Sequence, residues 1–321
     1  MAVFIHSPIK TVAAAFIFCL MSSGVLSNDL KVIVHSTSGG HMIHAKIWAK
    51  NAKKYHDGNI IVHAIPGGIG IAAANYLYNV AARDGSEIGS LHSTVTAFSM
   101  LGESTVKYDL AGFNWLGSVL DGRKDPFLIL AKAGPEPLVA GVEGGLSINH
   151  IKFANKFLGL RIKEVSGYQD VGQLKLAFEK NEVNLIYRNL VGIKTIAPEW
   201  LLDTRVMPLI QYGNGNNRHA LYPNSPTLMD FAKSDEDRQA IDAFEKTLII
   251  TRGFVAPPNV PMDKVNHLRV LFASVLSDKE YLAETEKVGI SVTPIYWSEI
   301  EKIVKEIKLL SPEISGKLRQ F

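Results

Sequence analysis

Short apolar runs alternate with amphipathic stretches along most of this chain. Apolar residues recur at helical spacing in several stretches, as Ile43, Ile47 and Trp48 do after the first run. The alternation predicts an α/β fold with parallel or mixed sheets covered by helices. The expected strands are 31–35, 59–64, 87–91, 127–131, 138–141, 162–165, 183–187 and 248–255, and the clearest helices are 148–158, 235–246, 262–276 and 298–310.

The order of these elements predicts two α/β lobes, the second inserted into the first. We expect residues 28–130 and 251–321 to form lobe 1 and residues 131–250 to form lobe 2, with extended crossings near Leu130 and Ile250. Ligands bind outside the carboxyl ends of strands in open α/β sheets. The loops that follow the strands are therefore the first places to look for a site.

Residues 1–27 differ from the rest of the chain. An apolar run, Thr11–Leu20, follows Lys10, and Val25 and Ser27 stand at the −3 and −1 positions of an expected cleavage site. This pattern is typical of a signal peptide and predicts export to the periplasm. The alternatives are a short membrane anchor and a buried N-terminal helix, but charged sequence begins immediately after this segment.

Composition narrows the function further. The chain has 321 residues, 47% of them hydrophobic, with 34 basic and 31 acidic residues. The apolar content excludes disorder, and the balanced charge shows no basic stripe for nucleic acid. A single cysteine excludes a disulfide framework and a thiolate metal cluster. We expect a monomer.

Three glycine-containing loops are the sharpest local features. They are Ser38-Gly39-Gly40, Pro66-Gly67-Gly68-Ile69-Gly70 and the loop at Gly144–Ser147, and each precedes an expected helix. Glycine lets a ligand approach the backbone, and a helix N-terminus attracts negative charge. Together the loops predict a cleft that binds a carboxylate from both lobes.

Histidines lie near the ends of the first three strands and at the start of the first helix. These are His35, His63 and His92, with His41 and His44 in the helix. Converging neutral imidazoles bind zinc, so a periplasmic metal-binding protein is an alternative function. A lone strand histidine is more often a hydrogen-bonded structural residue, and we predict no metal.

The second lobe contributes further candidates. Arg188, with Asn189 beside it, follows an apolar strand, and its planar guanidinium matches a carboxylate. A surface or interlobe salt bridge is the equal alternative for Arg188. Tyr168 has the chemistry to stack on a ligand or to pack in the lobe core.

Catalytic motifs are missing from the sequence. It has no G-x-S-x-G elbow and no H-E-x-x-H, and its one cysteine, Cys19, lies in the expected signal peptide. The stretch from Gly68 to Ala73 fits G-x-G-x-x-A, but His92 stands where a dinucleotide site needs an acidic residue. We therefore expect no enzyme activity and no cofactor, with an exported hydrolase or a sensor-partner protein as the remaining alternatives.

Several of these segments together resemble the periplasmic substrate-binding receptors of tripartite tricarboxylate transporters, the Bug or TctC-like family. The match is carried by Ser38–Gly40, the run Pro66–Gly89, Val165–Tyr168, Leu176–Asn184 and Phe254–Pro261. The resemblance implies a two-lobed, type II-like periplasmic binding fold with a hinge. It also implies a function, the capture of a small organic acid for delivery to integral-membrane permease subunits.

The family resemblance extends the candidate site. It implies a carboxylate cradle from the first two loops, a floor from residues 92–93 and an opposing wall from the second lobe. The full candidate ligand-binding set is Ser38, Gly39, Gly40, His41, Met42, Pro66, Gly67, Gly68, Ile69, Gly70, His92, Ser93, Thr94, Gly145, Ser147, Tyr168, Arg188 and Asn189.

The chain departs from the family pattern at four of its positions. His41 and Met42 replace a usual glycine and acidic residue, Leu146 replaces a common serine, and Arg188 stands where many members carry an acid. Our hypothesis is that Arg188 favours a more anionic ligand. An unchanged ligand affinity in Arg188→Ala would remove Arg188 from the site.

Overall fold

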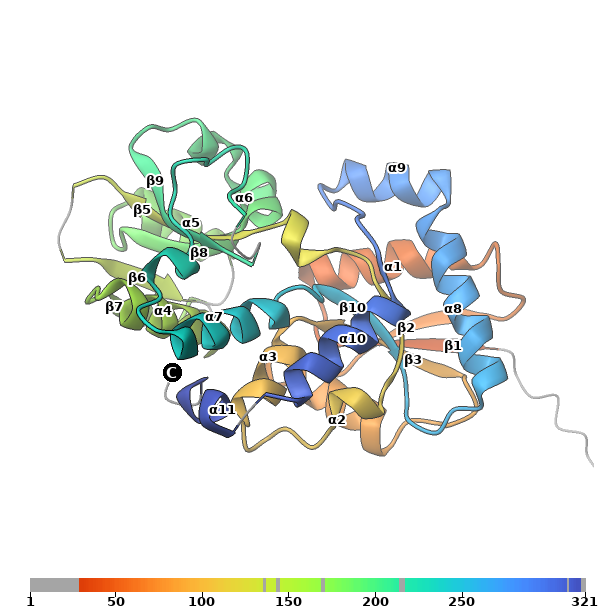
Figure 1. Ribbon diagram of the computed structural model, residues 1–321. Helices are drawn as coiled ribbons and strands as arrows, with labels where there is room; N and C mark the ends of the chain where they lie inside the picture. Colours follow the sequence, from red (N-terminus) through yellow and green to blue (C-terminus); the bar gives the residue numbers. More distant parts are fainter. Residues whose placement is uncertain are drawn as a thin grey trace, which may run out of the picture.

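The computed structural model describes residues 29–134, 137–142, 145–168, 171–213, 217–310 and 312–318. The expected signal peptide, residues 1–27, lies outside the described residues. Within them the chain forms two mixed sheets, each with helices on both faces (Figure 1).

The first sheet has six strands in the order β11-β4-β10-β3-β1-β2. The first three strands of the chain pair in parallel, while β10 is antiparallel to both β3 and β4. The bounds are β1 (Leu30–Val34), β2 (Ile60–Ala64), β3 (Glu87–His92), β4 (Asn114–Ser118), β10 (Arg252–Ala256) and β11 (Ile295–Tyr296).

Side-chain alternation along β1 decides which helices cover each face of this sheet. Val32 packs with α1 (Gly39–Ala52), α8 (Met262–Leu276) and α9 (Lys279–Lys287). The neighbouring Ile33 points to the opposite face. There it packs in the cluster that contains α2 (Ile71–Asn79), α3 (Thr94–Leu101) and α10 (Trp297–Lys308). Both Val32 and Ile33 are completely buried, as expected for a parallel sheet.

The second sheet has five strands in the order β7-β6-β8-β5-β9. Strands β6, β7 and β8 run in parallel, whereas β5 is antiparallel to β8 and β9. Helices α4 and α7 cover one face, and α5 and α6 cover the other. The bounds are β5 (Phe127–Lys132), β6 (Val139–Val142), β7 (Lys163–Ser166), β8 (Leu185–Asn189), β9 (Val206–Tyr212), α4 (Gly145–Leu158), α5 (Val171–Glu179), α6 (Leu190–Ile196) and α7 (Asp235–Thr247).

Two segments connect the lobes and lie side by side: residues 119–126, which include a short 3-10 helix (Gly122–Lys124), and residues 248–251. The amide of Gly122 donates to the carbonyl of Ile249 at 2.9 Å, and Asp121 forms an antiparallel bridge with Ile250. A side chain at Gly122 would collide with the main chain, because its Cβ would lie 1.9 Å from the Leu248 oxygen. The two connecting segments therefore pack directly against each other.

The first crossing lies earlier than the sequence pattern indicates. Leu130 is in the middle of β5, and the whole of β5 pairs within the second sheet. An apolar strand looks the same in sequence whichever sheet it joins, so the pattern of apolar residues does not locate the crossing. The second crossing contains Ile250, which bridges to Asp121 of the first.

Helix α7 also holds the lobes together. It packs on the second sheet and contacts α3, α10 and α11 (Pro312–Leu318). One continuous apolar cluster consequently runs from Ile33 in the first lobe to Phe244 in α7. Within the described residues, the helices are too short or too polar to cross a bilayer.

Candidate functional site

The loops after β1, β2 and β3 meet at one end of the first sheet. Thr94 Oγ1, after β3, donates to the Ile69 carbonyl at 2.5 Å. A Cβ placed on Gly70 would lie 3.7 Å from both His35 Cβ and Thr94 Oγ1. The structure thus brings the loops after β2 and β3 together beside the end of β1.

The loop after β2 has an unusual backbone. Gly67, Gly68, Ile69 and Gly70 have φ values of 133°, 54°, 49° and 107°. Three of these positions suit glycine, but Ile69 is β-branched and is strained in the left-handed region. Pro66, Gly67 and Gly68 are exposed. The surrounding contacts therefore hold a costly conformation at a solvent-accessible loop.

Helices that follow the parallel strands share an electrostatic feature. None of α1 to α6 has an acidic residue in its first turn. Each of α7 to α11 does have one. Acidic residues in the first turn neutralise the helix macrodipole. Among the described helices, the six that follow the parallel strands lack this compensation, whereas α10, which begins directly after β11, has it in Glu299.

The N-caps of α1 and α7 show the same contrast. Ser38, at the start of α1, makes no side-chain capping hydrogen bond. Ser234, at the start of α7, accepts a hydrogen bond from the amide of Asp237. Ser38, Gly39 and Gly40 are exposed, so the first amides of α1 have no partner within the helix and face solvent.

Three imidazoles gather where these loops meet. The ring centroid of His35 lies 4.5 Å from that of His41 and 5.2 Å from that of His92, and the rings of His41 and His92 are 5.8 Å apart. His41 Nε2 donates to the Ser90 carbonyl at 3.1 Å. His41 is thereby fixed by β3 and buried.

Burial keeps these imidazoles neutral. Desolvation, reinforced by the charge of Arg252, lowers the pKa of His35 to about 4 and that of His92 to about 3. Burial holds the pKa of His41 well below its usual range. The amide of Thr94 donates to His92 Nδ1 at 3.2 Å, so the proton of neutral His92 is on Nε2. His92 is therefore a neutral donor.

Arg252, at the start of β10, is the basic residue of this cluster. It pairs in register with His92 on β3. One terminal guanidinium nitrogen, Nη2, lies 3.6 Å from the position a Cβ would take on Gly40. Its Nε is buried without a hydrogen-bond partner. Our sequence interpretation missed Arg252, because it is the one charged residue in an apolar run assigned entirely to a strand.

The end of β8 and the start of α6 approach the cluster of imidazoles and Arg252 from the second lobe. Asp125, in the first crossing, accepts from the Val191 amide at 2.8 Å and from the Asn189 side chain. Burial raises the pKa of Asp125, while these hydrogen bonds and the charge of Arg252 act against that rise. Asn189, predicted as a ligand contact, is thus anchored to the crossing.

The other predicted second-lobe residues are more dispersed. Arg188 lies against α6, with its Cδ 3.7 Å from where a Gly192 Cβ would be. Tyr168 packs against the cluster formed by α5, α6 and the second sheet. Gly145 begins α4. The side chain of Ser147 lies outside what the structure describes.

Four further residues of the first lobe are buried within it. Met42 is buried in the core between α1 and the first sheet. Ser93 and Thr94 are buried beneath the loop after β2. His44 Nε2 hydrogen-bonds the Tyr281 hydroxyl at 2.7 Å, on the side of α1 that faces α9.

The histidines do not form the metal site considered as an alternative. His63 is exposed on the edge strand β2, away from the imidazole cluster. Within the described residues, no three His, Cys, Asp or Glu side chains are arranged to hold a metal ion. The positive charge of Arg252 beside His35, His41 and His92 also disfavours a cation there.

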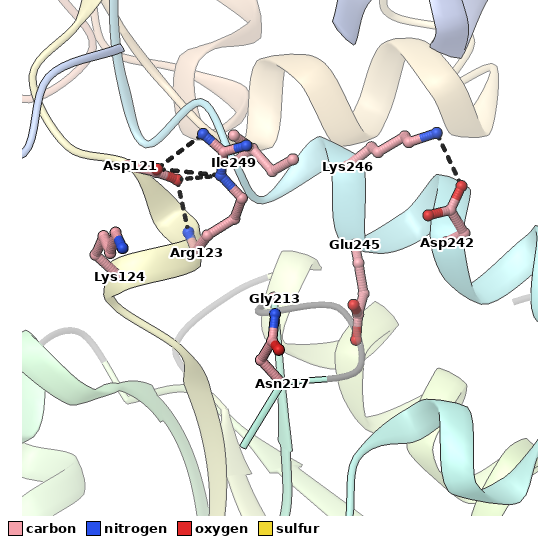
Figure 2. A pocket seen from close by; sticks show the side chains of 9 residues that line it. All are labelled: Asp121, Arg123, Lys124, Gly213, Asn217, Asp242, Glu245, Lys246 and Ile249. Atoms are coloured by element: carbon pink, nitrogen blue, oxygen red, sulfur yellow. Dashed lines mark hydrogen bonds and ion pairs between the residues drawn. The ribbon is translucent and has the colours of Figure 1, made fainter. Parts of the chain in front are cut away.

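A different pocket, of about 580 Å³, lies between the first crossing and α7 (Figure 2). Arg123 pairs with Asp121 at 2.8 Å and with Glu299 at 2.7 Å, and Lys246 pairs with Asp242 at 2.8 Å. Glu245 adds a buried carboxylate to its wall. The protein's own acids balance the bases of this pocket, so it attracts anions less than the end of the first sheet does.

A second pocket, of about 440 Å³, lies between the lobes. Lys194 and Thr195 of α6 line one side, and α9 with residues 289–292 lines the other. A Cβ on Gly289 would be 3.0 Å from Thr195 Oγ1. The lobes thus touch at the edge of this pocket.

Known proteins resemble this chain in structure, not closely in sequence. No family model matches it, and neither does any curated protein sequence. A TctC solute-binding protein from Polaromonas, solved without ligand, superposes with a TM-score of 0.65 at 15% identity and covers 92% of this chain and 100% of its own.

Two ligand-bound structures from Rhodopseudomonas palustris give similar superpositions. MatC with bound malate has a TM-score of 0.61 at 16% identity, over 91% of this chain and 98% of its own. A protein with adipate has a TM-score of 0.63 at 17% identity, over 90% and 97%. These matches confirm the two-lobed periplasmic binding fold, and the resemblance to TctC-like receptors is confirmed at the level of the fold.

Proposed function

We propose that this chain is a periplasmic receptor of the Bug or TctC-like family that captures a small organic acid between its lobes. In this proposal it delivers the acid to the permease subunits of a tripartite tricarboxylate transporter. The single observation that carries the proposal is the set of helices α1 to α6, which begin at strand ends with no acid in their first turns. Such N-termini favour an anion.

The exposed loops give this charge preference a place to act. Gly39, Gly40, Gly67 and Gly68 offer main-chain amides with little steric obstruction. Lobe closure around a bound acid would exclude water and strengthen each contact in the lower dielectric. Binding chemistry of this kind requires no nucleophile and no cofactor.

The structural neighbours add support from outside the chain. Malate and adipate, bound by two of them, are both dicarboxylates. The leader segment fits an exported receptor, with its apolar run and small residues before position 28. Together these features favour a carboxylate ligand over a neutral sugar or a metal.

A thermal-shift screen of the purified protein against organic acids tests the proposal. A ligand that binds only the folded state stabilises it by about 2.7 kcal/mol at a concentration 100 times its Kd. We expect at least one di- or tricarboxylate to raise Tm in a concentration-dependent way, and its neutral ester to have no effect. Stabilisation by divalent metals alone, reversed by chelator, would instead favour the metal-binding alternative.

A further inference from the structure

We propose that Arg252 is the counter-ion of the ligand, pairing with one carboxylate of the bound acid while the imidazoles of His92 and His35 complete the subsite. The ligand class is thus an acid with one fully ionised carboxylate buried against the first lobe. This inference rests on the proposed function and deepens it.

The first argument is the position of the charge. Arg252 follows directly on the second crossing, and its Nη2 lies 3.6 Å from the position of a Cβ on Gly40, at the N-terminus of α1. A guanidinium and a helix N-terminus are both positive, so they do not stabilise one another. An anion placed between them satisfies both.

The second argument is that the protein supplies no such anion. Within the described residues Arg252 has no salt bridge, and its Nε is buried without a hydrogen-bond partner. Arg123, Arg205 and Arg269 each pair with a carboxylate at 2.7–2.9 Å. Burying an unpaired charge is costly, so a group that pairs with Arg252 in the complex is expected.

The carboxylate that interacts with Arg252 electrostatically is already engaged. Asp125 is in range to interact electrostatically with Arg252, but Val191 and Asn189 hold its oxygens at the start of α6. Lys194 adds a positive charge on the same side. The ligand is therefore left as the partner for the guanidinium.

The third argument concerns the groups around the guanidinium. His35, His41, His44 and His92 all interact electrostatically with Arg252, and all are neutral at physiological pH because burial lowers their pKa. His92 Nε2–H is a donor, as the hydrogen bond to its Nδ1 requires. The cluster thus combines one permanent charge with neutral donors, which suits a carboxylate and rejects an amine.

Arginine also gives this subsite a geometric preference. Its planar fork binds the two oxygens of a carboxylate together, whereas lysine acts as a point charge. An amide replaces one of those oxygens by a donor that repels the guanidinium N–H groups. We therefore expect the receptor to discriminate strongly between an acid and its amide.

The test is titration calorimetry with the tightest-binding acid from the screen and its monoamides. The proteins are wild type, Arg252→Gln and Arg252→Lys, with Arg205→Gln as the matched control. Arg205 is an exposed second-lobe arginine paired with Asp203. We expect Arg252→Gln to bind the acid about 100-fold more weakly and Arg252→Lys about 10-fold more weakly. Arg205→Gln should stay within about twofold of wild type.

The amides separate a direct pairing from a structural role. For wild type, at least one monoamide should bind about 100-fold more weakly than the acid, and this difference should largely vanish in Arg252→Gln. Because Arg252→Gln removes a buried charge without a pair, its melting temperature should equal or exceed that of wild type.

Two results overturn the inference without touching the proposed function. One is acid binding by Arg252→Gln within about twofold of wild type. The other is a discrimination between acid and amide that is the same in Arg252→Gln as in wild type. Failure of the wild-type protein to bind any acid would overturn the proposed function and, with it, this inference.

Discussion

The buried imidazoles are the residues whose protonation matters most to this fold. His35, His41 and His92 are packed against one another and against Arg252, so a proton on any of them would be opposed by desolvation and by like charge. Because these imidazoles are neutral, Arg252 is the one permanent positive charge among them. The arrangement also makes stability depend on pH.

We predict that the free energy of unfolding falls between about pH 6.5 and pH 4. The unfolded chain takes up protons at its histidines as pH drops through 6.5, whereas the folded pKa of His35 is about 4. Stability is therefore retained above that window and lost within it, by about 1.4 kcal/mol per pH unit for each buried histidine. Urea unfolding at several pH values measures this slope.

His63 supplies the control for that experiment, because it is exposed on β2. The slope should become shallower in His35→Gln and stay unchanged in His63→Gln. A free energy of unfolding that is constant across the window would show that the histidines are not buried as neutral groups.

At the scale of single residues, sequence reasoning located part of the candidate site. Histidines and glycines at strand ends were recognisable because each follows an apolar run. Arg252 was not recognisable, because a single charged residue between Thr251 and Gly253 forms no sequence pattern. Its significance depends on β10 pairing with β3, which no local pattern reveals.

Among the elements, the helices divide into two electrostatic groups. Helices α1 to α6 follow the parallel strands and have no acid in their first turns, whereas each of α7 to α11 has one. Acidic first turns stabilise helices. Under the proposed function, the first group gives up some helix stability so that its N-termini can bind an anion.

Substituting Ser38 by aspartate tests this trade directly. Ser38 has the extended backbone of an N-cap but makes no capping hydrogen bond. An aspartate there should cap α1 and raise the free energy of unfolding by about 0.5–1 kcal/mol. It should also weaken acid binding by about 10-fold or more, because its carboxylate competes with the ligand. Chemical unfolding and calorimetry measure the two effects.

Ser234→Asp is the matched control on α7, where Ser234 is already the N-cap. It should leave acid binding unchanged. If Ser38→Asp bound the acid as tightly as wild type, the N-terminus of α1 would not be part of the site.

Elements that were harder to predict break the usual patterns. β9 contains Pro208, which weakens a strand prediction, yet β9 is an edge strand with a register shift opposite Leu130. β4 contains Gly117, whose extra side chain would lie 2.2 Å from Phe272. Both exceptions are tolerated by tertiary contacts that a local sequence pattern does not contain.

The whole molecule is two lobes joined by two crossings that pack against each other (Figure 1). The alternation of strands and helices was sufficient to predict this architecture. It was not sufficient to place β5, because an apolar strand fits either sheet. The family resemblance added the type II-like periplasmic binding fold, and the structural neighbours confirm that fold.

Two regions of the molecule compete as the place where a ligand binds. The pocket between the first crossing and α7 has a volume of about 580 Å³, but its acids and bases pair with one another (Figure 2). The end of the first sheet combines free helix N-termini with Arg252. Electrostatics therefore favours the second region for an anion.

A crystal structure of the protein with its tightest-binding acid decides between these regions. We predict one carboxylate within about 3 Å of the Arg252 guanidinium and of main-chain amides in the loops at Gly39–Gly40 and Gly67–Gly68. An acid bound instead among Asp121, Glu245 and Lys246, or outside the lobes altogether, would contradict the account.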